Sequence, residues 1–382
     1  MGALNGLKIV EFGGIGPGPF CCMLLADMGA EVIRIDRVAA VGKDRLEPKF
    51  NPMHRGQRSI ALDLKHPDGV NTALRLCDKA DIVIEGFRPG VMEGLGLGPE
   101  MITARNAKII YGRMTGWGQT GPLAQAPGHD LNYIALTGAL HAIGKANTGP
   151  VPPLVLAGDM GGGGMYLAVG VLAAYIESQR SGKGQVVDAA IVDGSASLMT
   201  AFYGMLASGS IVEKRESNRL DGGSHFYNVY ETKDGQYVCV ASTEPQFYSL
   251  LVEALGLNEA DIPQNDRNKW PQHRATIANV FKQKTRDEWN AWLAEKNLCY
   301  SPVLSMSEAP HHPHNAVRGN FVDIDGVTQP APAPRFSRTK SVIKSAPAYA
   351  GADTTGVLND WGFAPAEIEA LIERNAAKQR PG

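Results

Sequence analysis

The sequence predicts an α/β fold in which a doubly wound, mostly parallel sheet forms a large domain and a smaller α+β domain follows it. The start of the chain alternates a strand-like run, LKIVEF, a helical run closed by Gly29, FCCMLLADMGAEV, and a second strand, VIRIDR. SIALDL, DIVIEGF and KIIYGRMTG continue the strand pattern, with helical segments such as PDGVNTALRLCDKA between them. Near residue 226 the pattern changes, because FYNVYET and QYVCVAS flank the turn KDGQ as a hairpin does.

The remaining segments set the predicted domain limits. DLNYIALTGALHAI and GMYLAVGVLAAYIESQRSG have helical spacing and are expected to pack on the sheet, while LVLAG before Asp159 looks like a strand. QPAPAPRFSRTKS is rich in proline and predicts an extended linker. We therefore divide the chain into a large domain at 1–190, a linker at 191–225, a small domain at 226–315, a second linker at 316–340 and a C-terminal segment at 341–382.

Composition excludes several classes of protein. The 382 residues carry 37 basic and 39 acidic side chains, a formal charge of -2, so a nucleic acid is not expected as a partner. The five cysteines are odd in number and lack C-x-x-C spacing, which argues against a disulfide framework or a zinc site and favours the reducing cytoplasm. His311, His312 and His314 lack ligand-like spacing, so no metal is expected.

Targeting signals are not predicted either. The N-terminal MGALNGLKIVEFGG does not have the pattern of a signal peptide, and the apolar runs are too short and too broken by glycine for a membrane span. The last residues, AAKQRPG, do not form a peroxisomal tripeptide.

Glycine loops suggest a nucleotide only weakly. GGIGPGP follows the first strand, but a G-x-G-x-x-G pattern fails at Pro19 or Cys21, and the prolines at 17 and 19 lack amides. SGKGQ is not a Walker loop, because no Ser or Thr follows Lys183. A tight turn or a different phosphate ligand is favoured over a nicotinamide cofactor.

Basic residues at strand ends are more informative. Arg37, Lys65 and Arg88 follow three predicted strands, where the carboxyl ends of a doubly wound sheet face the ligand crevice. They suit a phosphate-bearing ligand, and the alternative for each of them is a solvated surface charge.

Three acid–base residues stand at predicted helix starts. His129 precedes the helix that begins near Asp130, so a base lies beside backbone amides that have no partner within the helix. Asp159 precedes four glycines, which are unfavourable in ordered backbone unless something approaches them closely. Glu244 precedes Pro245 at a first helical position. Taken singly, each is also explained as part of an ordinary helix cap.

Together these segments resemble the alpha-methylacyl-CoA racemases of the family III CoA-transferase superfamily. The resemblance covers nearly the whole chain, and GHD with TEPQFY is specific to the racemase branch. The motifs that carry it include IVEFGGIGPGPFCCMLLADMGAEVIRIDR, RSIALDLK, VIEGFRPGVMEGLGLGPE, YGRMTGWGQTGP, GHDLNY, GDMGGG, SGKGQVVDAAIVDG, LDGG, TEPQFY and APRFSR.

The resemblance implies an interlocked homodimer whose subunits have a large CoA-binding domain with a Rossmann-like sheet and a small domain, the chain returning to the large domain at its end. It implies that His129 and Asp159 are two opposed bases, and that Glu244 of the partner subunit orients His129. It places the CoA contacts on Ile15, Arg37, Leu62, Asp63, Leu64, Lys65, Gly86, Phe87, Arg88, Gly128, Leu131, Asn132 and Tyr133.

The chemistry agrees with this assignment. Inverting a carbon alpha to a thioester requires one base on each face, and the Asp130 amide at the helix start would donate to the enolate oxygen. The predicted activity is interconversion of (R)- and (S)-2-methylacyl-CoA by two-base 1,1-proton transfer through an enolate, with no cofactor beyond the CoA moiety of the substrate. An adaptable apolar surface for the acyl chain is one interpretation of four methionines, and core packing is the other. They are Met160, Met165, Met199 and Met205.

Two alternatives remain. A family III CoA-transferase would use Asp159 as a covalent nucleophile and would not need His129 or Glu244. A catalytically silent acyl-CoA-binding protein would need none of the three. Gly94 and Val155 also depart from the family pattern, which often has a basic residue and Asn at these positions, and this bears on CoA affinity and on the substrate.

Overall fold

The computed structural model describes residues 2–381 and divides the chain into two compact units. The first comprises the residues up to Thr137, Leu154–Leu198 and the residues from Val317 onward, and the second comprises Gly138–Pro153 and Met199–Ala316. The residues of 138–153, which the sequence assigns to the large domain, and those of 199–225, assigned to a linker, therefore lie in the second unit.

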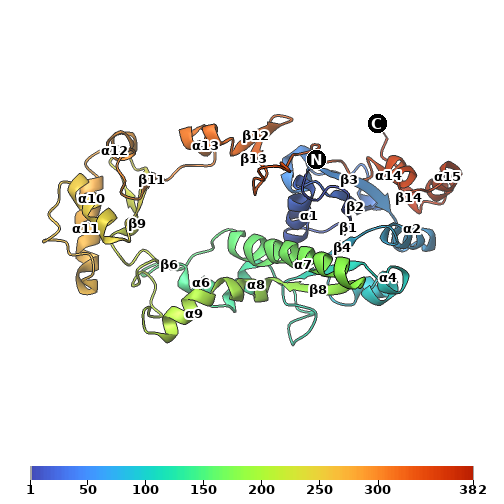
Figure 1. Ribbon diagram of the computed structural model, residues 1–382, viewed down its shortest axis with the longest axis horizontal. Coiled ribbons are helices and arrows are strands. Elements are labelled where there is room, and N and C mark those ends of the chain that lie inside the picture. The colour runs from blue at the N-terminus through green and yellow to red at the C-terminus, as the bar shows by residue number, and fades with distance from the viewer. Residues whose placement is uncertain (1, 382) are drawn as a thin grey trace. The chain divides into compact units, whose positions relative to one another are not determined.

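The first unit is built on a seven-stranded sheet with the order β14-β3-β2-β1-β4-β5-β8, parallel except for β14 (Figure 1). This confirms the predicted α/β class and the doubly wound parallel sheet. The strands are β1 (Lys8–Phe12), β2 (Glu31–Arg37), β3 (Gln57–Leu62), β4 (Ile82–Glu85), β5 (Ile110–Thr115), β8 (Gln185–Ala190) and β14 (Ala377–Lys378).

Helices cover both faces because the strand residues alternate between two apolar layers. Val10, Phe12 and their neighbours pack with helices α2, α4, α14 and α15, whereas Ile9 and its neighbours pack with α1 and α7. The bounds are α1 (Pro17–Asp27), α2 (Pro67–Cys77), α3 (Val91–Gly94), α4 (Pro99–Arg105), α5 (Asp130–Ala135), α7 (Tyr166–Ser181), α8 (Ile191–Leu198), α14 (Thr354–Asp360) and α15 (Pro365–Glu373).

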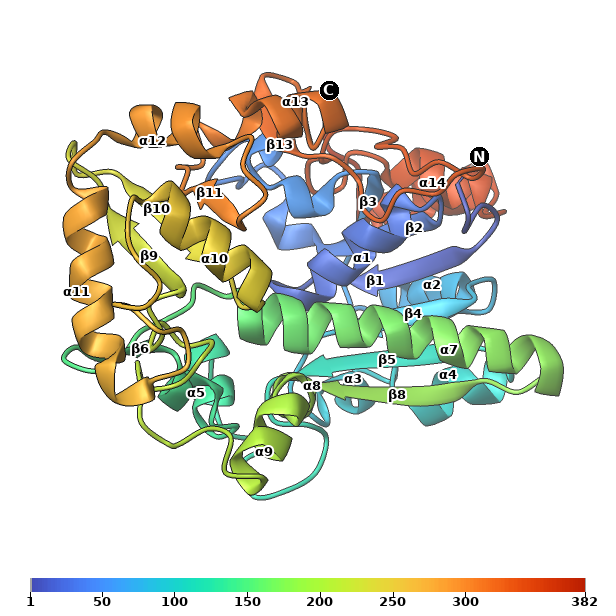
Figure 2. The ribbon, with the colours of Figure 1, turned by 60° about the vertical axis from the view of Figure 1, so that its left-hand side comes forward.

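A π-helix, Leu156–Met165, leads directly into α7, and α7 runs along β5 and β8 (Figure 2). The expectation of a strand before Asp159 was therefore wrong. The π-helix and α7 together form a continuous helix, Leu156–Ser181. Among the described residues it is the one helix that is long and apolar enough, by length and composition, to cross a membrane. The sequence predicted no run of that kind. Leu167, Val171 and Ala174 are buried in the α1 layer, which is also how the core helix of a globular domain packs.

Two other predicted elements are divided in the structure. The segment expected as one helix at 130–143 breaks where Gly138 takes φ 78°, so that α5 ends and α6 (Ala139–Ala142) begins after it. Part of the expected linker at 316–340 forms a hairpin of β12 (Phe321–Ile324) and β13 (Val327–Pro330), because Asp325 and Gly326 both take positive φ at its turn.

The second unit has a three-stranded antiparallel sheet, β11-β10-β9, whose hairpin β9–β10 confirms the predicted strand pair. Its core is aromatic, with Tyr230 stacked on Phe281 at 5.3 Å between ring centroids. The elements are β6 (Gly144–Lys145), β7 (Gly149–Pro150), α9 (Thr200–Ala207), β9 (Tyr227–Glu231), β10 (Tyr237–Ala241), α10 (Pro245–Ala254), α11 (Trp270–Phe281), α12 (Arg286–Leu293) and β11 (Tyr300–Pro302), with α13 (Pro313–Arg318) at the boundary.

Candidate active site

A cavity of about 350 Å³ opens where β1, β4 and β5 end, at the edge of the sheet where doubly wound folds bind ligands. Its wall contains both predicted bases of the first unit, His129 and Asp159. Six residues predicted to contact CoA or lie beside His129 also line it: Ile15, Gly86, Phe87, Arg88, Gly128 and Tyr133.

His129 is the residue immediately before α5, in extended backbone with φ −136° and ψ 173°. Its carbonyl oxygen accepts from the Asn132 amide at 2.8 Å, and its own amide donates to Asn132 Oδ1 at 3.0 Å. These backbone contacts hold the start of the helix while the imidazole stays exposed. The amides of Asp130 and Leu131, the first two residues of the helix, have no carbonyl partner within it, so they can donate to a negatively charged oxygen.

Asp130 holds Asp159 through its side chain, which the sequence did not suggest. Asp130 is 4% exposed, and its Oδ1 accepts from the backbone amide of Asp159 at 2.7 Å. A Cβ on Gly158 would lie 2.2 Å from that same Oδ1, so only glycine fits beside it. Asp130 Oδ2 is buried and makes no hydrogen bond to the described residues. The carboxylate of Asp130 therefore lies behind Asp159.

The pKa of Asp159 is raised to about 6, first by burial, then by the neighbouring Asp130 carboxylate, with His129 partly offsetting the rise. Asp159 lies inside the π-helix, so the alternative of an ordinary helix cap was wrong. Its Oδ2 faces Gly16, where a Cβ would stand 3.1 Å away. A carboxyl group that titrates near neutral pH is suited to accept and donate protons.

The four glycines after Asp159 are explained by close approach, as the sequence predicted, but the approaching groups belong to the chain itself. A Cβ on Gly162 would lie 2.4 Å from Ser195 Oγ of α8, and one on Gly164 would lie 2.7 Å from the Phe20 ring of α1. The glycines thus let the π-helix pack directly on two helices.

Several of the predicted CoA residues lie at or just after the ends of β2, β3 and β4. Arg37 and Leu62 are paired in the register of β2 and β3, and Lys65 follows β3 as an exposed side chain. The Glu85 carboxylate fixes the loop after β4: its Oε2 accepts from Phe87 N at 2.7 Å, and its Oε1 accepts from Arg113 Nε at 2.9 Å. Seven predicted residues do not line the cavity: Arg37, Leu62, Asp63, Leu64, Lys65, Leu131 and Asn132.

The cavity wall also contains residues that were not predicted from the sequence, among them Glu11, Glu85 and Trp117. Glu11 and Glu85 are acidic residues in otherwise apolar strands, and that departure from the strand pattern was the available signal. Trp117 packs edge-on against Tyr133 with 4.8 Å between ring centroids, and nothing in its local sequence marked it.

Glu244 lies in the second unit, where it immediately precedes α10 and its Pro245. Thr243 Oγ1 donates to Glu244 Oε2 at 2.8 Å, and the exposed carboxylate does not cap the helix. Glu244 is thus the N-cap residue of α10 by position, but its side chain makes no capping hydrogen bond.

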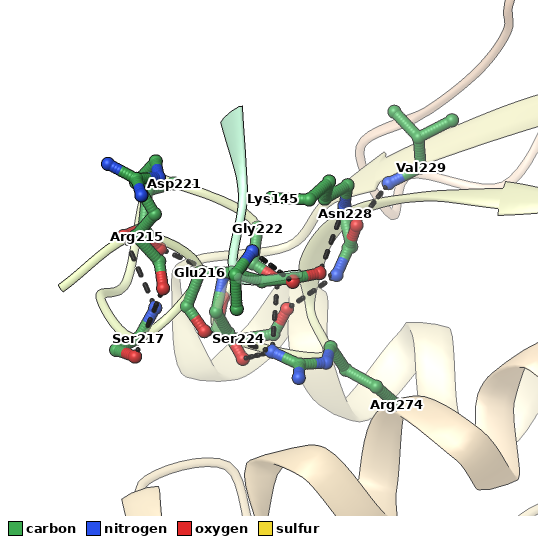
Figure 3. Close-up of polar contacts among 12 residues, drawn as sticks. Lys145, Arg215, Glu216, Ser217, Asp221, Gly222, Ser224, Asn228, Val229 and Arg274 are labelled. Carbon is green, nitrogen blue, oxygen red and sulfur yellow. Dashed lines mark hydrogen bonds and ion pairs between the residues drawn. The ribbon is translucent and has the colours of Figure 1, made fainter. Parts of the chain in front are cut away.

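The LDGG segment, part of the resemblance, organises a polar network in the second unit (Figure 3). Arg274 Nη1 donates to the carbonyl oxygens of Gly222 and Gly223 at 3.2 and 2.6 Å. Asn228 Nδ2 donates to the Gly222 carbonyl at 2.7 Å, while Lys145 pairs with Glu216 at 3.1 Å. A separate, largely apolar cavity of about 950 Å³ in this unit is lined by Met199 and Met205 among others.

Comparison with known proteins assigns the family. The model of CoA-transferase family III matches residues 4–354. The chain belongs to that family. It is 43% identical to alpha-methylacyl-CoA racemase of Mus musculus over 372 residues, 96% of each chain, and 40% identical to alpha-methylacyl-CoA racemase of Homo sapiens, covering 98% of this chain and 99% of that protein. The recognition of racemase relatives from the motifs is confirmed.

The fold of this chain is also similar to a solved structure. A CAIB/BAIF family protein from Brucella suis matches with a TM-score of 0.82 at 26% identity, covering 94% of this chain and 99% of that one.

Proposed function

We propose that this family III protein is an alpha-methylacyl-CoA racemase that interconverts (R)- and (S)-2-methylacyl-CoA thioesters. The observation that carries the proposal is that His129 and Asp159 line one cavity at the sheet edge. The 40–43% identity to proteins named alpha-methylacyl-CoA racemase supports it.

In the proposed reaction one of the two bases removes the α-proton and the other delivers a proton to the opposite face of the planar enolate. The pKa of Asp159, near 6, lets this group serve as base in one direction and as acid in the other. The amides at the start of α5, with that of Asp130 first, would stabilise the enolate oxygen. Proton transfer of this kind involves no change of oxidation state, so we propose no cofactor beyond the CoA moiety.

The ligand contacts follow the same edge of the sheet. We propose that Arg37, Lys65 and Arg88 bind the phosphates of CoA, because guanidinium and ammonium groups at this edge supply the charge-assisted hydrogen bonds that phosphate needs. The loop of Gly86–Arg88 would contact the nucleotide, because the hydrogen bond from Phe87 N to Glu85 fixes the loop backbone in position.

We further propose a homodimer in which Glu244 of the partner subunit orients His129. Large apolar side chains on one helix, including Val169 at 64% and Ile176 at 55% exposure on α7, support an interface with a second copy. All five cysteines are free thiols, which is compatible with the proposed cytoplasmic location.

The test is to incubate one pure epimer of a 2-methylacyl-CoA with the protein in heavy water. Proton exchange at the α-carbon is followed by NMR, and the epimer ratio by chiral chromatography. Exchange with approach to a near-equal mixture is expected. Binding without exchange, for both branched fatty acyl and sterol side-chain thioesters, would contradict the proposal.

The second candidate is a CoA-transferase, favoured by the position of Asp159 in the cavity wall. In that reaction a carboxylate oxygen attacks the thioester carbonyl and CoA leaves as the thiolate, so that a mixed anhydride remains on Asp159. Trapping with hydroxylamine and mass spectrometry distinguish the two. His129→Ala should abolish α-proton exchange in a racemase and leave anhydride formation intact in a transferase.

A further inference from the structure

Glu11 is a buried carboxyl group in the centre of the sheet that the proposed mechanism does not use. It lies on β1 between β2 and β4, and its residue is 1% exposed. Neither carboxyl oxygen has a nitrogen or oxygen hydrogen-bond partner among the described residues, although the Cys22 thiol adjoins the group. Glu11 nevertheless belongs to the wall of the cavity that holds His129 and Asp159.

The groups around Glu11 do not supply a free cation. Arg34, its register neighbour on β2, donates to Asp36 Oδ2 at 2.9 Å, to Gln57 Oε1 at 3.5 Å and to the Ala348 carbonyl at 3.1 Å. Every nitrogen of the guanidinium group thus already has a partner, and its positive charge lowers the pKa of Glu11 by less than burial raises it. The other charge near Glu11 is that of Asp36 itself, which opposes ionisation.

The remaining neighbours are uncharged. Helix α1 contributes the buried thiols of Cys21 and Cys22, of which Cys22 adjoins the carboxyl group as a weak hydrogen-bonding group. On β4 the register neighbour is Ile84, which has no titratable group. Such a carboxyl group is partly protonated near neutral pH, because burial penalises the charged form and raises the pKa of Glu11 to about 7.

A protonated carboxyl group needs an acceptor for its O–H, and the described residues provide no oxygen or nitrogen acceptor, leaving only the weak sulfur of Cys22. The adjacent start of α1 offers few donors to a ligand, because the cavity residues Pro17 and Pro19 have no backbone N–H. The pantetheine arm of an acyl-CoA carries carbonyl oxygens that lose water when they enter such a cavity. The Glu11 carboxyl therefore has a donor that lacks a strong acceptor, and the pantetheine arm has acceptors that lack a donor.

We propose that the Glu11 carboxyl donates a hydrogen bond to a carbonyl oxygen of the pantetheine arm and so positions the thioester in the cavity. The inference rests on the proposed binding of acyl-CoA, but not on racemisation. It also explains why the chain keeps an unpartnered acid where an apolar residue would stabilise the sheet.

The experiment measures dissociation constants by calorimetry for isobutyryl-CoA, a 2-methylacyl thioester without a stereocentre, and for ADP, which lacks the pantetheine arm. Glu11→Leu should weaken isobutyryl-CoA binding about 5- to 100-fold, as expected for a lost donor, and leave ADP binding unchanged. Its melting temperature should rise. Cys22→Ala is the matched control, because it removes the adjoining thiol and should leave both affinities unchanged.

The pH dependence provides a second, independent readout. Only the protonated group donates, so with a pKa of about 7 the Glu11 contribution should weaken about tenfold between pH 6 and pH 8. Glu11→Gln keeps an N–H donor and should not show this part of the dependence. His129, Asp159, Glu85 and Arg88 line the same cavity and are unchanged in that variant, so the difference between the two curves isolates Glu11.

The outcomes separate the two proposals. Wild-type affinity in Glu11→Leu, or identical pH curves for the wild type and Glu11→Gln, would overturn the role of Glu11. If Glu11→Leu does not fold, the comparison with Glu11→Gln decides. Loss of isobutyryl-CoA affinity in a protein that shows no α-proton exchange would support Glu11 and contradict the racemase. A wild type that binds no acyl-CoA would overturn both.

Discussion

The carboxylate of Asp130 should set part of the proton affinity of Asp159, and Asp130→Asn tests this directly. Asparagine keeps an Oδ1 that can accept the hydrogen bond from the Asp159 amide, which is 2.7 Å long in the wild type, but it removes the like charge. Because that charge is the second cause of the raised pKa after burial, we expect the pKa of Asp159 to fall from about 6 by roughly one unit, equivalent to about 1.4 kcal/mol.

Two measurements check this expectation. The acidic limb of the pH profile of kcat/KM should move down by the same amount, in the direction of reaction in which Asp159 acts as the base. A ¹³C NMR titration of the Asp159 carboxyl group gives the pKa without relying on activity. Asp130→Ala is the matched control, because it also removes the acceptor and should destabilise the fold by about 1–3 kcal/mol. An unchanged titration in Asp130→Asn would refute the electrostatic argument.

Three further predictions concern stability. Asp159→Asn should inactivate the enzyme, yet raise its free energy of unfolding by about 1–3 kcal/mol at pH 7.5, measured by urea unfolding. The reason is that the Asp159 carboxyl has a higher pKa in the folded than in the unfolded protein, so the wild type loses stability as the pH rises from about 4 to 6. The difference between variant and wild type should vanish below pH 4. Burial lowers the pKa of His225 to about 3, so on acidification the unfolded chain takes up this proton before the folded one does. The free energy of unfolding should therefore fall by about 2 kcal/mol between pH 7 and pH 5, and His225→Gln should reduce that fall. Gly158→Ala would place a Cβ 2.2 Å from Asp130 Oδ1 and should destabilise the protein by more than about 2 kcal/mol in thermal melts, whereas Gly204→Ala, in α9 with open space around it, should gain about 0.5–1 kcal/mol.

Much of the fold was predictable because the strands of the first unit carry continuous apolar runs. LKIVEF, VIRIDR and DIVIEGF became β1, β2 and β4, since strands buried on both faces are specified by local composition. The π-helix at Leu156–Met165 was not predictable, because LVLAG is equally compatible with a strand and only the packing of its glycines on α1 and α8 selects the helix. Tertiary contact overrode local preference there.

The candidate site was predictable to the extent that its residues stand at element ends. His129 was identified from the predicted helix start and Asp159 from the four glycines that follow it, and the structure places both in one cavity. The side-chain role of Asp130 was not predictable, because its contact with the Asp159 amide joins positions 29 residues apart. Glu11 was also missed, although an acid in the apolar run LKIVEF is a visible departure from the strand pattern.

The pKa of Asp159 thus depends on backbone packing as well as on its charged neighbours. Asp130 can contact the Asp159 amide only because Gly158 has no side chain, and the π-helix can pack on α1 and α8 only because of its glycines. A like-charged pair of this kind opposes folding, as does the unpartnered acid at Glu11. Substitutions that remove these charges should thus separate activity from stability, whereas substitutions in the apolar sheet should reduce both.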